Sequence, residues 1–252
     1  MTLQDKKVIA VRTGKTIYKH EGKVYKTFEK NYKKSDILNE ALNHARVEES
    51  GIAVPTLYEV NCYDGKWTIV YQEIEGKTLE QLMNEHPENM DEYMDLFLNL
   101  QLEIHDHNLP HLNKIKDKLM VKIAACDLDA TVRYELHTVL AGMPTHEHVL
   151  HGDFNPSNIV ISSKDSRPYV IDWSHAAQGN SSYDAAMTYL EFILQDKQDL
   201  AERYLDAYVA KTETPKTYVQ RWIPLVAASQ LAVANPTQAE YLRKALNIYD
   251  HE

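Results

Sequence analysis

The feature that most constrains the fold is a set of polar residues placed at the ends of short apolar runs. His151-Gly152-Asp153 is followed by Asn158, five residues after the Asp. Ile159-Val160-Ile161 comes next, and after a polar turn-like stretch Tyr169-Val170-Ile171 leads into Asp172. The two β-branched runs predict a hairpin, because each run is short, apolar and bounded by turn residues. Asn158 and Asp172 are therefore expected at the ends of paired strands.

The same residues carry a chemical pattern. Protein kinases use a loop H-R-D-x-x-x-x-N and a downstream D-F-G; here Gly152 replaces the Arg, and Ile171-Asp172-Trp173 replaces D-F-G. Phosphoryl transfer from ATP needs one carboxylate to orient the attacking hydroxyl, and an amide and a second carboxylate to hold metal ions. Turn and helix-cap roles are the structural alternative for these side chains. Their position between predicted strands favours the phosphoryl-transfer site.

At these residues the chain resembles the aminoglycoside phosphotransferase and choline kinase superfamily. The resemblance implies an α+β, protein-kinase-like two-lobed fold, with a β-rich N-lobe containing one helix and a mostly helical C-lobe. It also implies ATP- and Mg²⁺-dependent phosphorylation of a hydroxyl on a small aminoglycoside-, choline- or sugar-like acceptor. Asp153 would be the catalytic base, and Asn158 and Asp172 would bind magnesium. Asp184 fits a family position with a structural role, and Ser174 stands where family members often have Glu.

The order of predicted elements agrees with this fold. The first third reads as strands with one helix, from about Asp36 to Glu49, which Ser35 would cap. The apolar positions of this helix are Ile37, Leu38, Leu42, Ala45 and Val47. Helices dominate from Thr78 onward. We expect a nucleotide-binding lobe over residues 1–76 and a helical catalytic and substrate lobe over 77–252, with a hinge at about 72–77.

Two charged residues are expected to fix the nucleotide. Lys26 lies between apolar positions of the strand Val24–Phe28, where its ammonium can reach the α- and β-phosphates. The family pattern places a Glu on the following helix to hold this lysine, and Glu40 has the matching spacing before Pro55. Other candidates, if the register is shifted or the pair lies elsewhere, are Lys23, Lys30, Glu48 and Glu49.

The rest of the nucleotide site is expected in two connecting segments. The resemblance implies that the Gln72 carbonyl and the Ile74 N–H hydrogen-bond the adenine, and that Tyr71 lines the rear of the pocket. Gly14, in the turn between the first two strands, would lie over the phosphates. The nearby Gly-Lys-Thr does not make a P-loop, because Ile9 stands where that motif needs its first glycine.

Composition narrows the remaining classes. With 44% hydrophobic and 25% charged residues the chain is an ordinary globular protein, and no apolar run is long enough for a membrane span. The net charge of −10 argues against a nucleic-acid-binding face, and it is compatible with a cationic substrate or with solubility alone. The N-terminal residues lack the apolar core of a signal peptide. Two cysteines without metal or redox spacing fit a reducing cytoplasm.

No sequence motif indicates which acceptor the pocket binds. Its candidate residues, from the helices on either side of the two motifs, are Asn155, Asp184, Tyr189, Glu191, Arg221 and Trp222. The main alternative to a small-molecule kinase is a non-catalytic, pseudokinase-like nucleotide-binding module, which should have lost one of the three polar groups. A metal-dependent hydrolase would need further short-spaced His or Asp ligands. A protein kinase would need an A-P-E segment and a longer activation loop.

Overall fold

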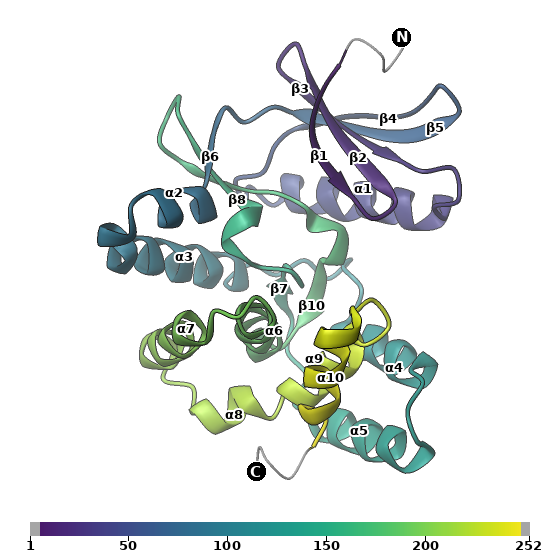
Figure 1. Cartoon of the computed structure of the whole chain (residues 1–252), viewed down its shortest axis with the longest axis vertical. Helices are drawn as coiled ribbons and strands as arrows, with labels where there is room; N and C mark the ends of the chain where they lie inside the picture. Colours follow the sequence, from purple (N-terminus) through teal and green to yellow (C-terminus); the bar gives the residue numbers. More distant parts are fainter. Residues whose placement is uncertain (1–5, 248–252) are drawn as a thin grey trace. The chain divides into compact units, whose positions relative to one another are not determined.

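The structure is a computed structural model that describes residues 6–247, in two compact units (Figure 1). The first unit comprises the residues through Met90 together with Pro156–His175, and the second comprises Asp91–Asn155 and the residues from Ala176 onward. The lobe boundary at about 72–77 stays a prediction. The prediction that no signal peptide is present concerns the N-terminal residues, and most of these lie outside the described residues.

A five-stranded antiparallel sheet forms the larger part of the first unit, in the order β1-β2-β3-β5-β4. Its strands are β1 (Lys7–Arg12), β2 (Lys15–His20), β3 (Lys23–Phe28), β4 (Leu57–Tyr63) and β5 (Lys66–Gln72). In the register, Lys26 of β3 pairs with Ile17 on one side and Ile69 on the other. Directly paired residues share a face, so the Lys26 side chain leaves the sheet on the face of Ile69. Phe28 lies two residues further along that face, and both apolar residues belong to a core that includes Ile37 of the next helix.

That helix, α1 (Lys34–Glu49), corrects the sequence analysis in two respects. Its N-cap is Lys33, which makes no side-chain capping bond, so the prediction of Ser35 as the cap is wrong. Leu38 and Leu42, predicted as apolar contacts, are 42% and 48% exposed. Ile37 and Val47 are buried as predicted, and the buried face also includes the polar residues Glu40, Asn43 and His44.

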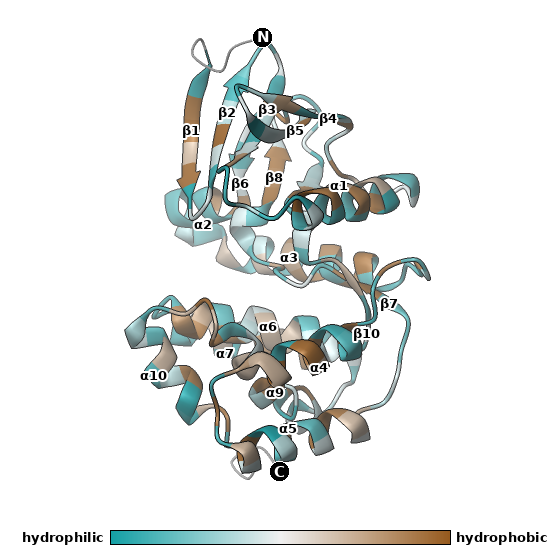
Figure 2. Ribbon diagram, turned by 90° about the vertical axis from the view of Figure 1, so that its right-hand side faces the viewer, coloured by the Kyte–Doolittle hydropathy of each residue, from teal (hydrophilic) through white to brown (hydrophobic). Residues whose placement is uncertain are grey.

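The rest of the first unit contains a three-stranded sheet, in the order β6-β8-β9, together with short helices. Its elements are β6 (Gly76–Thr78), α2 (Leu79–Glu85), η1 (Pro87–Asn89), η2 (Pro156–Asn158), β8 (Ile159–Ser162), β9 (Pro168–Val170) and η3 (Trp173–His175). The predicted hairpin is confirmed, since Ile159 pairs with Val170. Figure 2 shows β8 as a hydrophobic strand, as expected for a strand with a buried end.

Helices make up most of the second unit. Its elements are α3 (Met90–His105), α4 (Ile115–Ala125), α5 (Ala130–Gly142), β7 (His148–Leu150), β10 (Ala177–Gly179), α6 (Ser181–Leu194), α7 (Gln198–Thr212), α8 (Lys216–Gln220), α9 (Ile223–Gln230) and α10 (Pro236–Lys244). β7 and β10 pair antiparallel. α6 is the central helix, with ten of its fourteen residues buried. Pro224 lies in the first turn of α9, where proline is tolerated. Within residues 6–247, no helix is both long and apolar enough to cross a membrane.

Candidate active site

The first unit brings together three of the predicted site residues. The Lys26 ammonium contacts the Glu40 carboxylate of α1 and lies 2.9 Å from Oδ1 of Asp172. Lys26 and Glu40 are almost completely buried, whereas the Asp172 side chain is 29% exposed. Among the lysines and glutamates considered from the sequence, Lys26 and Glu40 are the two that pair. Glu48 instead accepts a hydrogen bond from the backbone N–H of Leu57 at 3.1 Å.

The charges of this cluster are mutually dependent. Burial by itself would lower the pKa of Lys26, but the carboxylates of Asp172 and Glu40 outweigh it and raise that pKa above its ordinary value. Burial would likewise raise the pKa of Asp172, but Lys26 and Lys15 hold it well below its usual range. A buried ammonium is stable only with such partners. The cluster therefore consists of a charged lysine and an ionised Asp172.

Lys15 is a second lysine at this carboxylate, and the sequence analysis did not assign it to the site. Its Nζ lies 3.9 Å from Oδ2 of Asp172. Burial, with the nearby charge of Lys26, lowers the pKa of Lys15. Strand register contains the signal that would have found it: Lys15 and Ile17 alternate onto one face of β2, and Ile17 pairs with Lys26.

The candidate hinge residues lie in the last two positions of β5 and directly after it. Tyr71 lies next to the cluster, because its hydroxyl interacts with Glu40 and its ring packs on His44 at 4.7 Å between centroids. Burial and the Glu40 charge raise the pKa of Tyr71 well above its ordinary value. Gln72 ends β5, where its N–H donates to the Thr56 carbonyl at 2.8 Å, and Ile74 lies in the connector to β6. Their carbonyl and N–H roles toward adenine stay predictions.

Gly14 forms the turn between β1 and β2. Its φ of +74° favours glycine, and a Cβ built there would lie 3.1 Å from the Tyr32 ring. Its carbonyl accepts a hydrogen bond from the Glu29 N–H at 2.9 Å, which ties the turn to the end of β3. Glycine is therefore required here for the turn itself, and a role toward phosphate stays a prediction.

Asn158 and Asp172 lie at the same end of the β8–β9 hairpin. The Asn158 carbonyl accepts a hydrogen bond from the N–H of Ile171, the residue before Asp172, at 2.9 Å. Asp172 has a φ of 62°, in the left-handed region that non-glycine residues rarely adopt and that is often maintained at functional sites. A carboxylate and an amide oxygen are suitable Mg²⁺ ligands, since Mg²⁺ is usually held by one or two protein oxygens, phosphates and waters. Asp172 lies beside two ammonium groups, which keep its carboxylate ionised, as a metal ligand must be.

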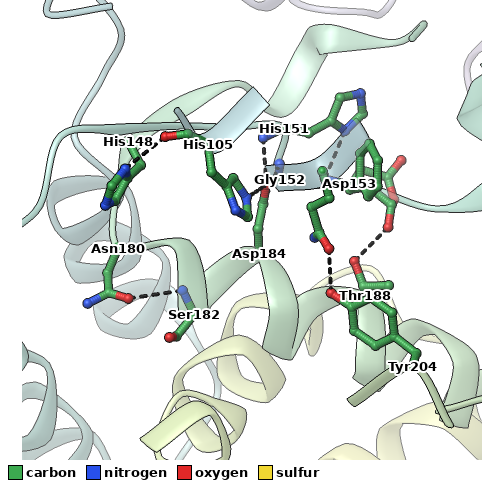
Figure 3. Close-up of polar contacts among 12 residues, drawn as sticks. His105, His148, His151, Gly152, Asp153, Asn180, Ser182, Asp184, Thr188 and Tyr204 are labelled. Carbon is green, nitrogen blue, oxygen red and sulfur yellow. Dashed lines mark hydrogen bonds and ion pairs between the residues drawn. The ribbon is translucent and has the colours of Figure 1, made fainter. Parts of the chain in front are cut away.

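The second unit holds the loop that carries Asp153, and one buried side chain fixes this loop (Figure 3). Asp184, in the first turn of α6, is 1% exposed. Its Oδ2 accepts the N–H of His151 and its Oδ1 accepts the N–H of Gly152, both at 2.8 Å. His105 Nε2 is 3.3 Å from Oδ2. His105 thus has a structural role, because it contacts the carboxylate that holds this loop.

Two further features hold the loop after Gly152. Gly152 has a φ of +78°, which explains why glycine, rather than the Arg of protein kinases, suits this backbone. The Thr188 hydroxyl of α6 donates to the Phe154 carbonyl at 2.7 Å (Figure 3). Asn155 Nδ2 donates to Oδ1 and to the carbonyl of Asp153, each at 3.1 Å. The Asp153 carboxylate is therefore positioned from both sides of its own loop.

The other acceptor candidates stay predictions, and the structure gives their surroundings in the second unit. Trp222 is completely buried and packs edge-on against Tyr183. Tyr189 donates a hydrogen bond to Glu202 at 2.7 Å, and Arg221 is exposed. Glu191 is bonded by Gln195 at 3.0 Å. Within residues 6–247, no group of three or more His, Cys, Asp or Glu residues is arranged to hold a metal ion.

Comparison with known proteins agrees with this geometry. The model of the phosphotransferase enzyme family matches residues 11–219. No curated protein is significantly similar in sequence. A solved structure of the aminoglycoside phosphotransferase APH(4)-Ia, in ternary complex with ADP and hygromycin B, superposes with a TM-score of 0.70 at 13% identity, covering 96% of this chain and 92% of that one. The choline kinase LicA from Streptococcus pneumoniae gives 0.61 at 14% identity, covering 98% and 94%.

A choline/ethanolamine kinase family protein from Mesorhizobium loti is similar as well, with a TM-score of 0.63 at 13% identity and coverage of 98% and 90%. At these identities the structures show a shared fold, so the predicted α+β, protein-kinase-like fold is confirmed. The predicted superfamily and the prediction of a small-molecule phosphotransferase are confirmed at the level of the family. The chain belongs to the phosphotransferase enzyme family.

Proposed function

We propose that the protein transfers the γ-phosphoryl group of ATP to a hydroxyl of a small molecule, in an Mg²⁺-dependent reaction in the cytoplasm. The observation that carries the proposal is the buried Lys26, which contacts both Glu40 and Asp172. A lysine held in this way is pre-positioned for phosphate oxygens. The ADP and AMP-PNP complexes of APH(4)-Ia support nucleotide binding by this fold.

The residues of the first unit would act on the nucleotide. Lys26 orients the α- and β-phosphates, Glu40 keeps its ammonium in place, and the Gln72–Ile74 backbone receives the adenine beside Tyr71. Asn158 and Asp172 would hold Mg²⁺, which neutralises charge on the phosphates when bound. Gly14, in the turn before β2, would cover the phosphates, and Lys15 is the first residue of β2.

Asp153 would act on the acceptor. Its carboxylate orients the hydroxyl and accepts its proton as the oxygen–phosphorus bond forms. The bond between the γ-phosphorus and the bridging oxygen breaks in line, and ADP leaves with that oxygen. The Asp184 contacts with His151 and Gly152 give Asp153 a fixed backbone, which this positioning requires.

Calorimetry of ATP binding, with and without Mg²⁺, tests the nucleotide part of the proposal. Wild type should bind ATP more tightly with Mg²⁺, and Asp172→Ala should lose that difference. Asp165→Ala is the matched control, since Asp165 is an exposed aspartate in the β8–β9 turn of the same unit. Equal metal dependence in Asp172→Ala and wild type would contradict the metal role. Absence of binding to wild type would contradict the proposed function as a whole. Binding without turnover on any acceptor would favour the pseudokinase-like alternative.

A further inference from the structure

Lys15 is a cation of the first unit to which the proposed reaction assigns no role. It is the first residue of β2, the strand between β1 and β3 (Figure 1), and it directly follows the turn at Gly14. Its Nζ lies 3.9 Å from Oδ2 of Asp172, and its side chain is 18% exposed. Lys26 lies 2.9 Å from Oδ1 of the same carboxylate. Asp172 thus has an ammonium group beside each of its two oxygens.

The two lysines differ in how closely carboxylates hold them. Lys26 contacts both Glu40 and Asp172, so it has two close anionic partners. Lys15 is paired at 3.9 Å, which is longer than the direct hydrogen bond of about 2.7–3.2 Å, so this ion pair is loose. Two like charges at one carboxylate, with little exposure to water, are costly in free energy. A further anion beside Lys15 would offset that cost.

The position of Lys15 indicates which anion it would bind. Lys15 and Ile17 alternate onto one face of β2, and Ile17 pairs with Lys26, so both lysines leave the sheet on the same face. In kinases the strand lysine pairs with the α- and β-phosphates, and the carboxylate that Asp172 matches holds metal ions bridging the β- and γ-phosphates. Because Lys26 would take the α- and β-phosphates, the γ-phosphate is the anion that remains for Lys15.

We propose that Lys15 binds the γ-phosphoryl group of the nucleotide, and thereby makes the site selective for a nucleoside triphosphate over the diphosphate product. This rests on the proposed function and adds a second phosphate-binding lysine to that site. The Lys15 side chain is a flexible stem with three N–H donors, so its ammonium can move from Asp172 to a phosphate oxygen. There it gains a charge-assisted hydrogen bond in place of the loose ion pair. The diphosphate lacks this contact, which favours its release after transfer.

Nucleotide selectivity tests the proposal without an acceptor. Calorimetry gives the dissociation constants of Mg-ADP and of Mg-AMP-PNP, an ATP analogue that keeps a γ-phosphate and resists hydrolysis. Lys15→Met should weaken AMP-PNP binding about tenfold or more, as the loss of one charge-assisted hydrogen bond does, and ADP binding by less than about twofold. An equal loss of affinity for both nucleotides, or a loss for neither, would overturn the proposal.

Further variants separate the charge of Lys15 from its packing. Lys15→Arg keeps a cation and should retain the preference for AMP-PNP over ADP. Lys15→Gln removes the charge with little change in length, should behave as Lys15→Met does, and replaces that variant if it does not fold. Lys164→Met is the matched control, since Lys164 is an exposed lysine in the β8–β9 turn of the same unit. A wild-type preference in Lys15→Gln, or a loss of preference in Lys164→Met as large as in Lys15→Met, would overturn the proposal.

The same titrations separate the role of Lys15 from the proposed function. ADP bound with nearly wild-type affinity shows that a Lys15 variant is folded and that the rest of the nucleotide site is intact. If wild type binds both nucleotides and Lys15→Met discriminates between them as wild type does, the role of Lys15 is wrong and the proposed kinase function stands. If wild type binds neither nucleotide, the proposed function is wrong, and the role of Lys15 fails with it.

Discussion

The carboxylate of Asp184 accepts a hydrogen bond from the backbone N–H of Gly152 at 2.8 Å, so that a buried side chain of α6 fixes the residue directly before Asp153. The same carboxylate accepts the N–H of His151 and faces His105. A buried carboxylate needs such donors to remain stable. Asp184 and the loop therefore depend on each other, and a defect in either should affect both stability and turnover.

Asp184→Asn should destabilise the protein by about 2–4 kcal/mol, because an amide cannot accept on both of its termini and buried N–H groups lose their acceptor. Turnover should fall as the loop loses its anchor. Urea unfolding followed by fluorescence measures the first effect, and Asp199→Asn, at an exposed position of α7, should stay within about 0.5 kcal/mol of wild type. If the two variants are equally stable, Asp184 does not anchor the loop.

Lys26→Met should lower the free energy of unfolding by about 3–5 kcal/mol at pH 7, because Glu40 and Asp172 then lose their buried cation. The pKa of Asp172 is lowered in the folded state, so its contribution to stability is present above its unfolded pKa of about 4 and is lost as the pH falls below it. The stability difference between wild type and variant should therefore be largest near neutral pH and should narrow below about pH 4. Denaturant midpoints over this range check it, and a pH-independent difference would contradict the charge pairing.

Gly152→Ala should lower turnover while leaving Mg-ATP affinity nearly unchanged, because φ at this position is +78° and alanine is strained there by about 1 kcal/mol or more. The strain displaces the Asp153 loop and not the nucleotide residues. Gly142→Ala is a suitable control: a Cβ at Gly142, at the end of α5, meets no atom within 4 Å. Normal turnover in Gly152→Ala would show that this backbone conformation is not needed for catalysis.

Sequence patterns predicted the hairpin and the order of elements, because motif spacing and strand punctuation are local properties. The Lys26–Glu40 pair was chosen through the resemblance to the phosphotransferase family. The buried face of α1 was predicted only in part. Ile37 and Val47 are buried as predicted, but Leu38 and Leu42 are exposed. The same face carries polar residues: Glu40 contacts Lys26, and His44 Nε2 is 2.6 Å from the Pro55 carbonyl. Polar side chains that face a site do not show in the hydrophobic pattern, so periodicity alone could not identify them.

Lys15 was not assigned to the site from the sequence. Lys15 reaches Asp172 through strand register and a contact between residues 157 positions apart, which no local pattern encodes. Properties that depend on tertiary burial require the structure.

Transfer of radiolabel from [γ-³²P]ATP to small molecules tests the central claim most directly. Wild-type protein, Asp153→Ala and the Asp165→Ala control would each be incubated with Mg-ATP and a deproteinised metabolite extract, and the labelled products separated by chromatography. The account predicts a labelled small molecule with wild type and the control, and none with Asp153→Ala although that variant still binds Mg-ATP. Equal labelling by Asp153→Ala, or no labelled small molecule from a wild-type protein that binds Mg-ATP, would contradict it.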